Sequence, residues 1–121
     1  MNILTDYLEL STKGDCDVID LTKKISDRLK SSKIKTGIMT LSVIGSTAAL
    51  TTCEYEPGLI KDLKEIFEKL IPEGKEYHHD QALGRRQWPR ASTLFFGRPF
   101  FDFAFFRRKI NLRNLAVGYF Y

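Results

Sequence analysis

An amphipathic helix over about residues 58–70 most constrains what this chain can fold into. Its apolar residues recur at the spacing of one helix face, and lysines and glutamates occupy the opposite face. Pro57 suits the first helical position because it has no N–H to leave unpaired there. Pro72 and Gly74 end the pattern. The sequence therefore predicts a helix that packs on the rest of the fold by its apolar stripe.

A second helix is predicted at about residues 21–32. Asp20 or Thr22 can accept a backbone N–H at its start. Its apolar face is marked by residues four apart: Leu21, Ile25 and Leu29. Three strands are predicted from alternating or β-branched runs: Ile3–Leu10, Ile38–Ile44 and Ala48–Cys53.

These elements give the order β-α-β-β-α, followed by a loop that holds Tyr77-His78-His79-Asp80. Three short strands are too few for two helices to cover, and eighty-odd residues form a marginal core. The remaining chain is therefore expected to complete the sheet. We predict one α+β domain over residues 1–121, with a mainly antiparallel sheet, two helices packed on one side and perturbed C-terminal strands.

The composition of the chain changes abruptly after residue 83. Residues 1–83 carry 11 basic and 14 acidic side chains, whereas residues 84–121 carry eight basic and one acidic. The second segment also holds seven of the eight arginines and eight of the nine phenylalanines. Such a change typically marks a domain boundary or a basic tail.

Several residues could carry chemistry, and each has a plainer interpretation. His78-His79-Asp80 could bind a divalent metal or move protons, but adjacent histidines in a charged loop are more often solvated. Glu54, Glu56 and Asp62 could form a carboxylate cluster, although the two glutamates also suit a helix start. Gly45-Ser46-Thr47 could offer amides and hydroxyls to a phosphate, or it is a turn. Cys53 is interpreted as a packed thiol.

Residues 15–83 resemble the YjbQ family. The resemblance is carried by the run Gly45-Ser-Thr-Ala-Ala-Leu-Thr-Thr-Cys-Glu-Tyr-Glu-Pro-Gly, by Leu70-Ile-Pro-Glu and by Tyr77-His-His-Asp. Many bacterial members have a histidine just before the Ser/Thr-Ala pair, where this chain has Gly45-Ser46. Members of this family are small cytoplasmic proteins, often described as secondary thiamine-phosphate synthases.

The resemblance implies a cytoplasmic homotrimer with ligand sites near the subunit contacts and a small phosphorylated substrate. It implies catalytic roles for His79, Asp80 and Glu54, with Ser46 and Thr47 as substrate contacts. His79 would be a ligand of a divalent metal, zinc or magnesium. The family's second histidine motif, Gly-His-x-His, has no counterpart after Asp80. We therefore expect weak metal binding and poor catalysis.

Residues 84–121 can be interpreted as a translation of the family's C-terminal part in a neighbouring reading frame. Back-translation of Leu83–Ser92 with a one-base offset permits Trp-Gly-Asp-Gly-Asn-Gly-His and then a second histidine. The same offset permits two further sequence motifs of the family, in the family's order, over residues 98–105 and 107–116. We therefore expect an extra base in the codons for about residues 80–83.

The alternative function is nucleic-acid binding by the basic, phenylalanine-rich tail, with arginines pairing to phosphates and aromatic rings stacking on bases. The out-of-frame interpretation is favoured over it, so we do not expect a nucleic-acid partner. A purely structural trimer subunit is a third possibility. No apolar run approaches the ~20 residues of a membrane helix, and no membrane partner is expected.

Overall fold

The computed structural model describes residues 1–14, 16–44, 48–72, 74–83, 100–106, 109–110 and 115–119. These residues form three helices and six strands. Their order is β1 (Asp17–Asp20), α1 (Thr22–Ser31), β2 (Thr36–Ser42), β3 (Ala48–Thr52), α2 (Pro57–Leu70), α3 (His78–Leu83), β4 (Phe100–Phe106), β5 (Lys109–Ile110) and β6 (Leu115–Tyr119). No helix among these described residues is long and apolar enough to cross a membrane.

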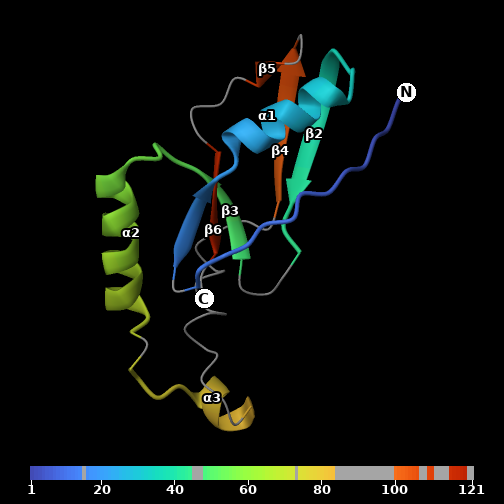
Figure 1. The fold of residues 1–121 in the computed structure, drawn as a ribbon. Helices are drawn as coiled ribbons and strands as arrows, with labels where there is room; N and C mark the ends of the chain where they lie inside the picture. The colour runs from blue at the N-terminus through green and yellow to red at the C-terminus, as the bar shows by residue number, and fades with distance from the viewer. Residues whose placement is uncertain are drawn as a thin grey trace.

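The strands form two three-stranded sheets, in the orders β1-β6-β3 and β2-β4-β5, and every pairing is antiparallel. Figure 1 shows β6 between β1 and β3, and β4 beside β2. The predicted α+β class with antiparallel pairing is therefore confirmed. The one expected sheet is divided into two, which meet where β3 approaches β4.

The central strand of each sheet comes from the last part of the chain. In β6, Val117 lies opposite Ile19 of β1 and Leu50 of β3. In β4, Phe103 lies opposite Met39 of β2. Among the described residues, β1 and β3 pair only with β6, and β2 pairs only with β4. The expectation that the remaining chain adds strands to the sheet is therefore confirmed. The expected perturbation of the C-terminal strands stays a prediction, because their side chains lie outside the described part of the structure.

Helix α1 holds the core together. Leu21, Ile25 and Leu50 form its centre, with exposed fractions of 5%, 2% and 3%. Partly buried residues of β1 and β2, among them Ile19 and Met39, pack against this centre. Burying one such side chain stabilises the fold by roughly 1.5–3 kcal/mol. Helix α1 therefore bridges the two sheets by its apolar face.

Local bonding explains where α1 begins and ends. The Asp20 carboxylate accepts hydrogen bonds from the backbone N–H and the hydroxyl of Thr22, at 2.9 and 2.7 Å. The expected role of Asp20 at the helix start is thus confirmed. At the other end, Lys33 adopts a left-handed φ of 62° and its N–H bonds to the carbonyl of Lys30, which stops the helix.

The predicted strand over Ile3–Leu10 is wrong. This segment lies extended without pairing to any described strand. Leu8 and Leu10 pack on the core instead, and the Asp6 carboxylate bonds to Arg28 at 3.2 Å. Alternate residues of a segment can pack on a core without a strand partner, so the same apolar alternation fits both structures.

Two further differences concern short elements. Strand β1 (Asp17–Asp20) has no counterpart among the predicted strands, and the loop predicted over residues 77–80 instead leads into α3 at His78. The N–H of Gln81 bonds to the carbonyl of Tyr77 at 3.4 Å, which closes the first turn of α3. Both elements are too short for a hydrophobic period to reveal them.

Helix α2 matches its predicted bounds within one residue, but its apolar stripe is less covered than that of α1. The stripe is half-buried along most of its length, and Ile66 and Leu70 are 51% and 56% exposed. No residue of α2 falls in the fully buried class. In Figure 1 this helix lies beside the β1-β6-β3 sheet and runs back alongside it towards α3.

Candidate functional site

The segment between β3 and α2 carries the acidic residues that the sequence analysis singled out. The carboxylate of Glu56 accepts hydrogen bonds from the backbone N–H groups of Gly58, at 2.8 Å, and Leu59. Glu56 therefore caps α2 and is committed to the helix start. A Cβ on Gly58 would lie 3.1 Å from both carboxylate oxygens of Glu56, so this glycine leaves room for the cap.

Glu54 lies two residues earlier and is exposed. The next residue, Tyr55, is tied to the first sheet because its hydroxyl donates a 3.1 Å hydrogen bond to the carbonyl oxygen of Val18. Val18 is buried in β1, and Tyr55 is 38% exposed. This bond fixes the connection that presents Glu54. No local sequence pattern marks this role of Tyr55.

Cys53 is the first residue of this connection between β3 and α2. Burial raises the pKa of its thiol, and the nearby charge of Asp20 raises this pKa further. A raised pKa keeps the thiol protonated and weakens it as a nucleophile. Both cysteines are free thiols. The interpretation of Cys53 as a packed thiol agrees with this environment.

The other candidates lie on or near α3. His78 opens this helix and is exposed, and His79 and Asp80 follow it in the first turn. The side chains of His79 and Asp80 lie outside the described part of the structure. Just before the helix, the Tyr77 hydroxyl donates a 3.0 Å hydrogen bond to the carbonyl of Pro72, and the ammonium of Lys75 lies 5.7 Å from the centre of the Tyr77 ring.

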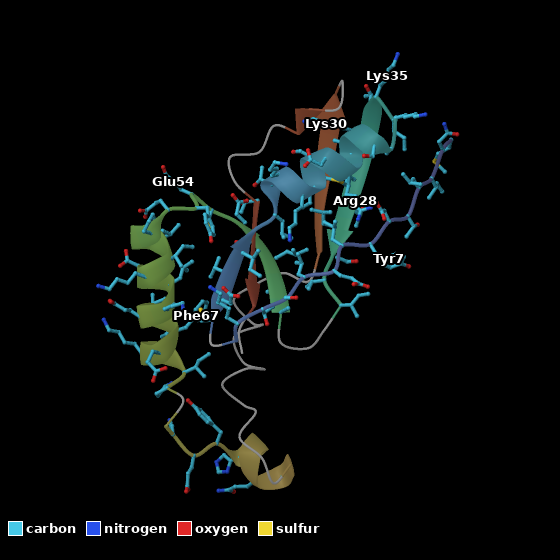
Figure 2. The ribbon with its side chains drawn as sticks, viewed as in Figure 1. Tyr7, Arg28, Lys30, Lys35, Glu54 and Phe67 are labelled. Atoms are coloured by element: carbon cyan, nitrogen blue, oxygen red, sulfur yellow. The ribbon has the colours of Figure 1, made fainter. Side chains whose placement is uncertain are left out.

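The structure does not bring Glu54 together with α3 in one chain. Glu54 precedes α2, and α3 follows it, so the 14-residue helix separates them. A helix of this length spans about 21 Å. Figure 2 shows Glu54 near the start of α2, at the end remote from α3. A metal ligand must lie about 2.0–2.2 Å from the ion, so these residues of one chain do not fit a common metal.

Two candidate residues cannot be placed. Ser46 and Thr47 lie outside the described residues, immediately before β3. Where side chains are described, no three histidine, cysteine, aspartate or glutamate residues group closely enough to hold a metal ion. The geometry therefore defines two separate polar regions, one at the start of α2 and one at α3.

Known proteins with similar sequences show which family the chain belongs to. A family profile described as "UPF0047 protein YjbQ-like" matches residues 6–93. The chain belongs to the YjbQ family. It is 32% identical over 80 residues to a UPF0047 protein of Methanothermobacter thermautotrophicus, and this match covers 66% of the chain and 56% of the relative. It is 35% identical over 74 residues to a UPF0047 protein of Archaeoglobus fulgidus, which covers 61% of the chain and again 56% of the relative.

Solved structures share the fold of this YjbQ chain at low identity. A YbjQ-like protein of unknown function from Sulfolobus solfataricus matches with a TM-score of 0.80 and 22% identity, over 91% of this chain and 80% of that one. A hypothetical protein from Aeropyrum pernix matches with a TM-score of 0.81 and 19% identity, over 92% and 83%. Matches of this extent reach beyond residue 93, where the family profile ends. The fold likeness therefore continues past residue 93, where the sequence profile ends.

Proposed function

We propose that this YjbQ-type chain contributes to a polar site between copies of a homotrimer, with a small phosphorylated substrate as ligand. The observation that supports this is the separation of Glu54 from α3 by the length of α2. A neighbouring copy can supply the second group where one chain cannot. Glu54 would come from one subunit and His79 with Asp80 from another, with Ser46 and Thr47 contacting the substrate.

The assembly is tested by measuring molar mass during size-exclusion chromatography, with light scattering, at several loading concentrations. The proposal expects about three times the 14.0 kDa of one chain. A concentration-independent mass of one chain would contradict it. The same result would leave the fold assignment untouched, since the fold is a property of the chain.

The proposed site is a poor metal site. Zinc is usually held by four ligands, three of them from the protein in catalytic sites. The chain has two histidines, and they are adjacent at positions 78 and 79. The family's Gly-His-x-His motif, which would supply further imidazoles, is absent from residues 84–121. We therefore expect weak binding of zinc or magnesium.

Calorimetric titration with Zn²⁺ at pH 7 tests this expectation. The predicted result is no binding tighter than the micromolar range, with little change in a His79→Ala variant. One tight site per chain that is lost in His79→Ala would contradict it. His78→Ala is the matched control, because it removes the adjacent imidazole from the same short helix.

Thiamine-phosphate synthase-like activity is the finer function that the family resemblance suggests. The reaction would join a hydroxymethylpyrimidine diphosphate to a thiazole phosphate and release pyrophosphate. With an incomplete histidine set, we expect only traces of pyrophosphate above a reaction without protein. Steady turnover that is lost on Glu54→Gln substitution would overturn the expectation of poor catalysis.

We also propose that residues 84–121 are translated one base out of step with the family's C-terminal part. The support is the back-translation of Leu83–Ser92, which permits the family's Trp-Gly-Asp-Gly-Asn-Gly-His in the neighbouring frame, and the same offset over residues 98–105 and 107–116. Nucleotide sequencing across codons 78–86 tests it. The proposal would be contradicted if the codons of residues 85–90, read in the neighbouring frame, do not encode the aspartate, asparagine and histidine of the family motif.

A further inference from the structure

Basic charge is concentrated on one short part of the chain, apart from the tail and from the proposed site. Residues 23–35 hold six of the eleven basic side chains of residues 1–83, but only one of the fourteen acidic ones. All six basic residues are exposed. We call this the α1 basic surface; it consists of Lys23, Lys24, Arg28, Lys30, Lys33 and Lys35.

Helix stability does not account for this arrangement. Lysines in the last turn of a helix interact favourably with its dipole, and Arg28 and Lys30 lie there. Lys23 and Lys24, however, lie in the first turn, where the helix dipole disfavours cations, and that turn contains no acidic residue. Lys23 is compensated by Asp27 one turn later, whereas the placement of Lys24 is unfavourable to the helix dipole.

Asp27 and Asp6 pair with three of these six side chains. The Lys23 ammonium lies 2.7 Å from Asp27, and the Lys30 ammonium lies 4.0 Å from the same residue. Asp6 pairs with Arg28 at 3.2 Å. Exposed pairs of this kind are weak and easily exchanged. An anionic ligand could therefore replace them.

An exposed aromatic ring borders the surface. The Asp6–Arg28 ion pair holds the N-terminal segment against α1, and the adjacent residue Tyr7 is 70% exposed. Figure 2 shows Tyr7, Arg28, Lys30 and Lys35 on the same side of the molecule. Proteins that bind single-stranded nucleic acids combine positive charge along the backbone with aromatic rings on which bases stack.

We propose that the α1 basic surface binds single-stranded nucleic acid, with its lysines on phosphates and Tyr7 stacked on a base. An anionic membrane is the less suitable partner. A helix that lies in a membrane interface inserts its apolar face, and the apolar residues of α1, Ile25 and Leu29, are buried in the core at 2% and 6% exposure.

Fluorescence anisotropy with a labelled 15-nucleotide oligo(U) tests the proposal on the full chain. The triple variant Lys24→Ala/Lys30→Ala/Lys35→Ala is expected to bind about tenfold or more weakly at 50 mM salt. The slope of log Kd against log salt should fall by about 2, since each phosphate contact on a single strand contributes about 0.7. The matched control Lys61→Ala/Lys64→Ala/Lys69→Ala removes three exposed lysines from α2 and should change Kd by less than about twofold.

Tyr7→Ala should weaken binding at least about fivefold, whereas Tyr7→Phe, which keeps a stacking ring, should not. Circular dichroism of each variant checks that the fold is retained. Absence of binding at 50 mM salt, equal losses in the two triple variants, or loss of binding only when tail arginines are replaced would each overturn the proposal. Co-sedimentation with vesicles containing phosphatidylserine, without oligo(U) binding, would overturn it in favour of a membrane.

Discussion

At the scale of single residues, Glu54 and Glu56 look alike in the sequence but act differently. Glu56 accepts two backbone N–H groups at the start of α2, whereas Glu54 is exposed at the connection from β3. Those N–H groups have no partner inside the helix, so the side chain that satisfies them stabilises the fold. Glu56 therefore has a structural role, whereas Glu54 is the glutamate assigned to the proposed site.

Glu56→Ala is expected to lower the free energy of unfolding by about 1 kcal/mol, because two N–H groups lose their acceptor. Urea unfolding followed by circular dichroism measures it. The matched control is Glu54→Ala, which should change the free energy of unfolding by less than about 0.5 kcal/mol. Equal effects of the two substitutions would refute the cap as the cause.

Cys53 gives the fold a dependence on alkaline pH. Its pKa is raised in the folded state by burial and by Asp20, so the unfolded chain releases this proton first. The contribution is fully present below the ordinary thiol pKa of about 8.5 and is lost as the pH rises through the folded-state value. Stability should therefore decrease above about pH 8.5.

Urea unfolding of the protein and of a Cys53→Ala variant at pH 7.5, 8.5 and 9.5 tests this dependence. The difference in unfolding free energy between the two proteins should narrow as the pH rises. A difference that stays constant over this range would show that the Cys53 thiol does not titrate differently in the two states.

At the scale of elements, the two main helices differ in how they are held. Helix α1 is held by buried side chains, whereas α2 has none and follows a connection fixed by Tyr55. The bond from the Tyr55 hydroxyl to the carbonyl of Val18 joins residues 37 positions apart. This bond links the start of α2 to β1, and the position of Glu54 depends on it.

Tyr55→Phe removes only this hydroxyl and leaves a carbonyl of a buried residue without its donor. We expect a loss of about 1 kcal/mol in unfolding free energy, with faster amide hydrogen exchange at the start of α2. Tyr7→Phe serves as the control because Tyr7 is 70% exposed. Unchanged exchange at α2 would mean that other contacts hold the helix.

Sequence periodicity predicted the elements that have a long one-sided pattern. Helices α1 and α2 and strands β2 and β3 all lie within two residues of their predicted starts and ends. It failed for Ile3–Leu10, because alternation does not distinguish a paired strand from an extended segment that packs by alternate residues. It missed β1 because four residues are too few to establish a period.

The candidate site was less predictable than the fold. Sequence motifs shared with the family indicated Glu54, His79 and Asp80, but a motif does not give the distance between residues. The predicted helix over residues 58–70 spans about 20 Å, but the family resemblance still grouped Glu54 with His79 and Asp80. The Tyr55 bond to Val18 had no local signal, because its partner is a backbone carbonyl of a distant strand.

At the scale of the whole molecule, the last strands complete both sheets. Strand β6 lies between β1 and β3, and β4 lies between β2 and β5. Strands β4 and β6 thus complete the sheets although they lie beyond residue 93, where the family profile ends. The phenylalanine-rich run of β4 has high strand propensity whatever its origin, which explains how the fold continues where the sequence likeness ends.

Val117→Pro is expected to destabilise the chain by about 3 kcal/mol or more, since proline removes a backbone donor and does not fit a central strand. Val117→Thr keeps the donor and the β-branched shape, so it should cost much less. Thermal unfolding compares the two. A similar melting temperature for both variants would mean that β6 does not lie between β1 and β3.

The most direct test of this account is a measurement of cross-strand nuclear Overhauser effects at Val117. We expect backbone contacts from Val117 to Ile19 on one side and to Leu50 on the other. Contacts to both strands would establish that the tail completes the YjbQ fold. Random-coil shifts for residues 115–119, with the core around Ile25 still intact, would contradict it.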